Sequence, residues 1–600
     1  MKSRIFQSMA AGAALACAVM AASSAPQSRA PLSGGSRAAG FDRYETGIAA
    51  WIWSDKIWYS PGERMTLKWT VKSYGEQYPV TVVAYWQNNE TGAKTYAPKG
   101  SSEVTDILGN AADSFQVIPL ADTEKGVLVG DGGLLPWNFG AVPEAPGMHT
   151  VVVEIRDSTG GRILKTLYQK VSIVKDFVDV TGNIESDTTW TPDKLYRLSG
   201  VVYVRNNATL TIKPGTLVMG QPGSQPPSVL VVTRNGKIMA EGTRSRPIIM
   251  TSALNPGERT RGDWGGLIML GKAPINVAPQ AGKGNENGEF FIEGLPATED
   301  TKYGGADAAH SCGSLKYVRV EYAGSIFAPN NESNSFTWGG CGTGTKADYL
   351  QAIYGLDDSF EWFGGTMGAK HLIGGLGADD YLDFQLGFTG KIQHGIFYYS
   401  ADSKGNRGIE GDNSEYDQAA TPLSNPTMFN LTFVGGGEPG FDEANAPGIY
   451  LRRGSAGSFN NILVTNFYSA GAFIDGTATQ EQVNAGKLTM NGILLWNNNL
   501  GKGGGTTLDS QVDAGMLDFA QGKRGSGKNF VAADPKLRRP FEYSDPDFRA
   551  LPGSPVFLAM WIQPPDDGFF DQSSRYLGGA AEEAWWEEWT SFLQDADIKK

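Results

Sequence analysis

Acidic side chains recur at a fixed spacing in the middle of this 600-residue chain. Asp357, Asp358 and Glu361 are each followed by another acid 22 residues later. The second set is Asp379, Asp380 and Asp383, and Asp402 lies one further interval of 22 to 23 residues along the chain. If each interval is one coil of a stacked β structure, equivalent side chains lie roughly 4.8 Å apart. Carboxylates at that separation repel one another, so we expect raised pKa values or a bound cation.

Calcium suits such a group of acids, because it accepts roughly six to eight oxygen ligands in a flexible geometry. The predicted calcium ligands are Asp357, Asp358, Asp379, Asp380 and Asp402. Zinc suits the region less well, since only His371 and His394 lie nearby in the sequence. The sequence contains no Walker loop, dinucleotide fingerprint or cysteine cluster, so we expect no organic cofactor.

The same residues allow two interpretations of function. In the enzymatic one, one carboxylate acts as general acid and another as base, or calcium neutralises a uronic acid, as in a glycoside hydrolase or polysaccharide lyase. The predicted catalytic residues are Asp358, Glu361, Asp380, Asp383, His371 and Arg407. In the structural interpretation, the acids cap turns beside glycines and only stabilise the coils.

Repeats around the acids predict the elements that position them. Phe429-Asn430, Phe459-Asn460 and Met490-Asn491 each open a strand-like segment, at intervals of 30 and 31 residues. Short β-rich runs that recur at such intervals without helical periodicity indicate a parallel β-helix, which we place at residues 176–560. The 78 glycines agree with an all-β chain that is rich in turns and poor in long helices.

A separate domain is predicted before this solenoid. Apolar residues alternate strictly from Met65 to Val71, and two further alternating runs, at 151–155 and 163–173, flank a Gly-Gly turn. Residues 41–175 therefore indicate an antiparallel β-sandwich of immunoglobulin-like type.

The other end of the chain predicts a cap on the solenoid. Within residues 561–600, Trp585, Trp589 and Phe592 follow one another at helical spacing. Because the last coil of a solenoid must be covered, we expect these residues to form a short helix that docks there.

The first residues indicate export. A basic start, an apolar run and a small-residue zone predict a signal peptide over residues 1–25, followed by a flexible linker over 26–40. Cys17 leaves a lipid anchor as the alternative to a free protein. We expect an extracellular, cell-surface or periplasmic location, without a transmembrane segment. In that oxidising compartment, Cys312 and Cys341 favour a disulfide over a metal site or a nucleophile.

The formal net charge is −13. It disfavours nucleic acid as a partner, because phosphate binding needs clustered Lys and Arg. It leaves cations and cell-envelope components such as polysaccharides as partners, and the sequence predicts no oligomeric state.

Several longer motifs resemble those of a family of secreted bacterial right-handed parallel β-helix proteins that is common in Bacteroidetes. They are Gly262-Asp263-Trp264-Gly265-Gly266, the run Asp357 to Gly365, and the closing Trp589-Thr590-Ser591-Phe592. The segment Asp547 to Pro555 is similar to the final coil of pectin-lyase-like β-helices. The resemblance implies the fold and a surface or secreted location, whereas the family has no assigned reaction.

Together these observations predict an exported β-helix protein that binds a polysaccharide through a calcium-associated acidic patch and, in the enzymatic interpretation, also cleaves it. The alternative is a non-enzymatic structural or adhesion protein of the cell surface.

Overall fold

The computed structural model describes residues 47–74, 80–89, 91–96, 114–117, 128–129, 135–157, 161–277, 288–328, 331–400, 405–438, 446–514 and 516–592. The predicted signal peptide and linker therefore lie outside the described residues, as does Asp402.

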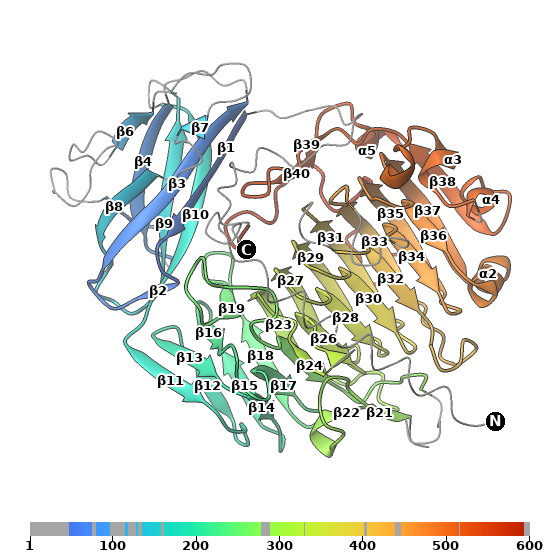
Figure 1. The fold of residues 1–600 in the computed structure, drawn as a ribbon, viewed down its shortest axis with the longest axis horizontal. Helices are drawn as coiled ribbons and strands as arrows, with labels where there is room; N and C mark the ends of the chain where they lie inside the picture. The colour runs from blue at the N-terminus through green and yellow to red at the C-terminus, as the bar shows by residue number, and fades with distance from the viewer. Residues whose placement is uncertain are drawn as a thin grey trace, which may run out of the picture. The chain divides into compact units, whose positions relative to one another are not determined.

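Two sheets form the first domain (Figure 1, blue to cyan). One contains β1 (Gly47–Ser54), β3 (Arg64–Tyr74), β7 (Leu128–Val129) and β8 (Leu135–Ala141). The other contains β2 (Trp58–Tyr59), β4 (Val80–Gln87), β5 (Lys94–Tyr96), β6 (Ser114–Val117), β9 (Gly147–Arg156) and β10 (Ile163–Ile173). The strands of both sheets are antiparallel except for the parallel pair β2 and β10. The two alternating runs that flank the Gly-Gly turn pair with each other as the antiparallel strands β9 and β10.

The core of this domain follows the alternation seen in the sequence. Met65 and Leu67 of β3 are fully buried and pack with Val151 and Val153 of β9. The domain is thus a two-sheet sandwich, and its immunoglobulin-like type stays a prediction.

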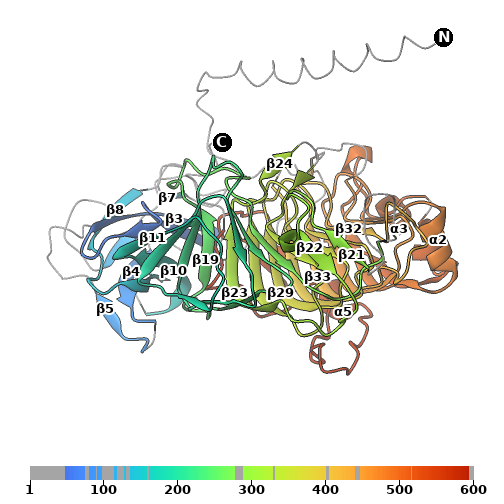
Figure 2. The same cartoon turned by 90° about the horizontal axis from the view of Figure 1, so that it is seen from below.

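The second domain is a right-handed parallel β-helix made of two long parallel sheets. The first sheet contains β11 (Asp176–Val180), β12 (Thr188–Trp190), β13 (Lys194–Leu198), β15 (Thr209–Ile212), β16 (Leu217–Gly220), β18 (Lys237–Glu241), β19 (Ile248–Ser252), β23 (Gly313–Glu321), β27 (Lys346–Ile353), β29 (Gly368–Gly375), β31 (Lys391–Tyr398), β33 (Thr427–Val434), β35 (Gly457–Thr465), β37 (Leu488–Trp496) and β38 (Ser526–Ala532). The second sheet contains β14 (Val201–Val204), β17 (Val229–Val232), β20 (Leu267–Leu270), β26 (Phe336–Gly339), β28 (Phe360–Phe363), β30 (Leu382–Gln385), β32 (Ile409–Asp412), β34 (Ile449–Arg452) and β36 (Ala472–Ile474). In the first sheet, β11, β13, β16 and β19 form one row and β12, β15 and β18 form a second, and both rows meet at β23. From β23 onward, and throughout the second sheet, the strands lie side by side in chain order, as β23, β29 and β33 do in Figures 1 and 2.

Shorter elements join and cover these sheets. Three small ladders pair β21 (Glu289–Phe291) with β22 (Lys302–Gly304), β24 (Ile326–Ala328) with β25 (Asn331–Glu332), and β39 (Leu537–Arg539) with β40 (Asp547–Ala550). The helices are α2 (Thr477–Asn484), α3 (Leu508–Gln511), α4 (Leu517–Ala520) and α5 (Pro555–Leu558), with the 3₁₀ turns η1 (Glu299–Thr301) and η2 (Leu500–Lys502). No described helix is long and apolar enough to cross a membrane.

One continuous apolar core fills the space between the two sheets of the solenoid. Rings stack along it from coil to coil, as Trp338 does on Trp362, with ring centroids 5.0 Å apart. Val483 of α2 and Phe519 of α4 join the same core. Because α2 and α4 also contact the last strands, β37 and β38, these helices cover the C-terminal end of the stack.

The C-terminal segment packs on the solenoid, but its form differs from the expected helix. Described residues 585–592 make turns and irregular backbone. The segment lies along the side of the first sheet, where Gln351 of β27 binds the backbone of Ser591 and Gln393 of β31 binds that of Asp571. Side-chain amides with both a donor and an acceptor satisfy its backbone, so it needs no helix there. We call residues 561–592 the tail.

The disulfide prediction is confirmed. Cys312 and Cys341 are bonded, with their Cα atoms 6.0 Å apart, and both are fully buried.

Candidate functional site

The stacked acids lie on the outer face of the second sheet. Phe360 and Trp362 of β28 point into the core, so Glu361 between them points outward. Glu361 pairs in register with Asp383 of β30, and Asp383 pairs with Glu410 of β32. The 22-residue interval is therefore one coil. Glu361, Asp383 and Glu410 thus occupy equivalent positions on three successive coils and form one column of acids. Glu410 follows Asp383 by more than 22 residues because the coil after Asp383 is longer.

Five carboxylates come together at this face. Asp357, Asp358 and Asp379 form one group, and Asp358, Glu361 and Asp383 form a second that shares Asp358. Within each group the ligand oxygens all lie within 4.8 Å of one another. We call these five residues the acidic cluster. Turns before β28 and β30 supply three of them, and the strands supply Glu361 and Asp383.

Asp358 and Asp380 also hold successive coils together. The Asn334 side chain accepts the N–H of Asp358, and the Asp358 carboxylate accepts the N–H of Asp380, at 3.1 and 3.0 Å. The Asp380 carboxylate accepts the N–H of Arg407 at 2.8 Å. One side chain per coil thus accepts a backbone N–H at the equivalent position of the next coil. We call this row of acceptors, Asn334, Asp358 and Asp380, the Asx ladder. Asn334 lies 24 residues before Asp358, so the longer coil hid it from a search at intervals of 22.

A row of arginines borders the acids on the following coils. Arg407 Nη1 lies 2.6 Å from Glu410 and 3.3 Å from Asp380, and all three side chains are buried. Arg452 and Arg453 both bind Asp412, at 2.8 and 2.7 Å. These contacts pair Asp380, Glu410 and Asp412 with arginines, and the charges of Arg407 and Arg452 also act on Asp379 and Asp383 of the acidic cluster.

Burial changes the protonation of the cluster. It is the main cause that raises the pKa values of Asp357, Asp358, Glu361 and Asp383 well above their usual range, and the neighbouring carboxylates raise them further. Burial raises the pKa of Asp379 to about 6, although Arg407 opposes the shift. Near neutral pH the cluster therefore needs either bound protons or a cation.

The structure does not bring His371 to the acids. His371 lies on β29 in the first sheet, about half a coil after Glu361, where its Nδ1 is 2.8 Å from an oxygen of Asp348. Its ring stacks on Tyr349 and His394, with centroids 4.2 and 4.9 Å apart. Of the predicted catalytic residues, the structure thus groups Asp358, Glu361 and Asp383, with Asp380 and Arg407 beside them on the ladder.

The donor set of the acidic cluster fits calcium. All its ligand atoms are carboxylate oxygens, the donors that calcium prefers. In addition, Asp383 Oδ1 is a buried oxygen with no hydrogen-bond partner in the described part of the chain. A cation would supply the partner that this oxygen lacks.

These features define a right-handed parallel β-helix protein with an acidic site on one sheet. Residues 182–534 match the family described as the pectate-lyase-like β-helix domain, and this match covers more than half of the chain. The protein therefore belongs to the pectate-lyase-like β-helix family.

Other comparisons add little to this assignment. A solved structure of the family 28 exopolygalacturonase of Yersinia enterocolitica is 10% identical, and the match covers 76% of this chain and 87% of that one. Its TM-score of 0.17 carries no argument about function. No curated protein matches the sequence.

Proposed function

We propose that this is an exported protein that binds an acidic polysaccharide through calcium held by the acidic cluster. The observation that carries the proposal is the convergence of five carboxylates, two groups of three sharing Asp358, on an outward sheet face. Membership of a pectate-lyase-like family supports a polysaccharide as the partner. The predicted signal peptide supports export.

In this proposal the protein supplies oxygen ligands and leaves part of the cation's coordination to the sugar. Asp357, Asp379 and Asp383 keep some exposure, whereas Asp358 and Glu361 are 7% and 3% exposed. The buried acids would therefore hold the cation from below, and the carboxylates of a uronic acid would complete its coordination from the solvent side. Calcium would supply charge neutralisation between two sets of carboxylates.

Cleavage would add one requirement, a proton donor or acceptor that reaches the glycosidic bond. Asp357 and Asp383 are both partly exposed, and both have pKa values raised well above the usual range in the calcium-free protein, so either could supply the proton where it does not bind the cation. A carboxyl group that keeps its proton near neutral pH can act as a general acid.

Calcium titration of the full chain tests the binding proposal. Calorimetry with calcium, followed by an array of acidic and neutral glycans with and without EDTA, should show a calcium site and calcium-dependent binding of acidic glycans. Asp383→Asn should weaken both, whereas Asp187→Asn, an exposed carboxylate on another coil, should change neither. Glycan binding that is indifferent to EDTA and to Asp383→Asn would refute the proposal.

A structural role is the second candidate, and the Asx ladder favours it. One carboxylate oxygen of Asp358 and one of Asp380 each accept a backbone N–H of the next coil, and the two residues are 7% and 2% exposed. In this case the protein is a surface or adhesion protein whose acids stabilise the stack. Unchanged stability in EDTA, together with no glycan on the array, would favour this candidate.

A further inference from the structure

The column of acids on the second sheet continues into two aromatic rings. Glu410 of β32 pairs in register with Tyr450 of β34, and Tyr450 pairs with Phe473 of β36. Ala472 and Ile474 lie in the solenoid core, so Phe473 between them points to the same outer face as the acids. Along one row of equivalent positions, this face therefore changes from carboxylates to aromatic rings.

Tyr450 is a fixed support for the ring of Phe473. The two rings stack with their centroids 5.4 Å apart and their planes at 21°. The Tyr450 hydroxyl donates to Asp475 at 2.9 Å. The guanidinium carbons of Arg407 and Arg452 lie 5.0 and 5.4 Å from the centre of the same ring, which is an attractive arrangement. Tyr450 is 5% exposed, whereas Phe473 keeps an intermediate exposure and is the ring that solvent reaches.

Phe473 is also the last ring of this row in the described part of the chain. There β36 is the final strand of the second sheet, and the next pass of the chain pairs with it only at the isolated bridge between Ala472 and Val512. Among the described residues, no further ring of the row therefore stacks on the face of Phe473 that is turned away from Tyr450. An aromatic ring beside polar groups is typical of the lining of a ligand site.

Two arginines lie on the coil between the acidic cluster and Phe473. Arg452 ends β34 and Arg453 follows it, and their side chains are 25 and 34% exposed. Both bind Asp412, but a guanidinium group has five N–H donors. Arg453 can therefore bind Asp412 and a carboxylate of a ligand at the same time.

The aromatic end of this row is well separated from the acids. Strand β30, which carries Asp383, is followed in the sheet by β32, β34 and β36. Adjacent strands are roughly 4.8 Å apart, so Phe473 lies about 14 Å from Asp383 along the stack. A single sugar ring does not span this distance, whereas a chain of several rings does.

We propose that the site binds a linear polyuronate along the stack, with calcium at the acidic cluster, a uronate carboxylate at Arg453 and a sugar ring on Phe473. This inference rests on the proposed function and specifies its ligand as a chain of several uronic acid units rather than a single sugar acid. Two contacts on one chain reinforce each other only when the chain is long enough to reach both. Affinity should therefore rise sharply at the chain length that first reaches Phe473.

Binding of oligogalacturonates and oligomannuronates of increasing length to the full chain tests the inference. By calorimetry in calcium, the hexamer of at least one series should bind about tenfold more tightly than its dimer. Phe473→Leu keeps an apolar side chain but removes the flat ring. It should weaken hexamer binding about tenfold and dimer binding by less than about twofold, with calcium affinity unchanged. Phe473→Tyr keeps a ring and should bind the hexamer as the wild type does.

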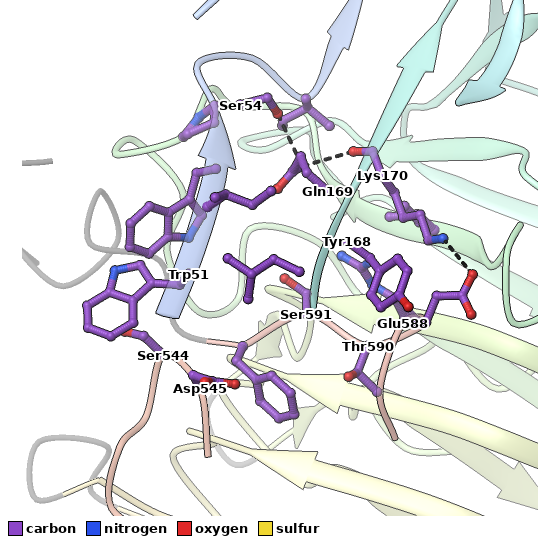
Figure 3. Close-up of a pocket in the computed structure, with 18 of the residues that line it drawn as sticks. Trp51, Ser54, Tyr168, Gln169, Lys170, Ser544, Asp545, Glu588, Thr590 and Ser591 are labelled. Carbon is purple, nitrogen blue, oxygen red and sulfur yellow. Dashed lines mark hydrogen bonds and ion pairs between the residues drawn. The ribbon is translucent and has the colours of Figure 1, made fainter. Parts of the chain in front are cut away.

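The matched control is Trp51→Leu, which removes another partly exposed aromatic ring. Trp51 lines a cavity of about 160 Å³ together with Tyr168 and Lys170 (Figure 3), and this lining includes neither Phe473 nor Arg453 nor the acidic cluster. Hexamer binding should therefore be unchanged. If Phe473→Leu fails to fold, Arg453→Gln is the second test, because it removes the arginine from the path of the chain and should also weaken hexamer binding.

The two possible failures can be distinguished. If no oligomer binds in calcium, the proposed function is wrong and this inference is wrong with it. If oligomers bind in calcium, the inference alone is wrong in any of three cases. These are equal affinity for dimer and hexamer, wild-type hexamer binding by the folded Phe473→Leu and Arg453→Gln variants, and a loss of hexamer binding in Trp51→Leu as large as that in Phe473→Leu.

Discussion

In the calcium-free protein, ionisation of Asp379 should destabilise the folded state. Burial raises its pKa to about 6 from an ordinary 3.8. Because the folded-state pKa lies above that of the unfolded chain, the folded state binds this proton more tightly. The stabilisation of the folded state by this bound proton is complete below about pH 4 and is lost as the pH rises through about 6. Two pKa units at about 1.4 kcal/mol each correspond to roughly 3 kcal/mol, and partial exposure of the side chain reduces this to about 2 kcal/mol.

The variant Asp379→Asn removes this cost. Its amide oxygen can still accept the hydrogen bond that Asn406 donates at 2.8 Å, so the shape of the site is kept. In EDTA at about pH 8, we expect the variant to be more stable than the wild type by about 2 kcal/mol, and at about pH 4 the two should be equal. Saturating calcium at the higher pH should reverse the order, because the neutral amide oxygen of asparagine is a weaker calcium ligand than the carboxylate of the wild type.

Urea unfolding of both proteins across this pH range measures the effect. Asp187→Asn is the control, since it makes the same chemical change at an exposed position. If wild type and Asp379→Asn lose stability in parallel as the pH rises, the carboxylate ionises without cost and the reasoning about the cluster is wrong.

Three other changes test the fold around the site. Asp358→Ala removes the acceptor of the Asp380 N–H and should cost about 1–3 kcal/mol in urea unfolding, whereas Asp358→Asn should restore most of it. Gln393→Ala removes both hydrogen bonds to the backbone of Asp571, so limited proteolysis should cut the tail faster, and equal cutting rates would contradict the docking. Trp362→Ala empties a fully buried position in the stacked core and should cost roughly 3–5 kcal/mol by thermal or chemical unfolding.

The stacking of the acids could be predicted from the sequence because it depends on one local quantity, the coil length. Two acids that are one coil apart must be neighbours in a parallel ladder, and Glu361 and Asp383 are. The same logic failed where a loop lengthens a coil. Glu410, 27 residues after Asp383, therefore takes the next place in the column, and Asn334 was missed.

Position around the coil is a different matter, because spacing along the chain does not reveal it. His371 follows Glu361 by only ten residues, yet it lies on the other sheet and binds Asp348. The turns between the sheets determine this, and their course depends on packing against neighbouring coils.

By itself, the sequence determined the all-β class, the disulfide and the repeat that gathers the carboxylates, since each follows from local periodicity or from the chemistry of a few residues. Only the tertiary structure decided how deeply the acids are buried, which arginines compensate them, and where the tail lies. Tertiary contacts join residues that are as far apart in the sequence as Gln351 and Ser591, which are separated by 240 positions. Burial, and with it the pKa values and the charge balance of the acidic cluster, arises from such distant contacts.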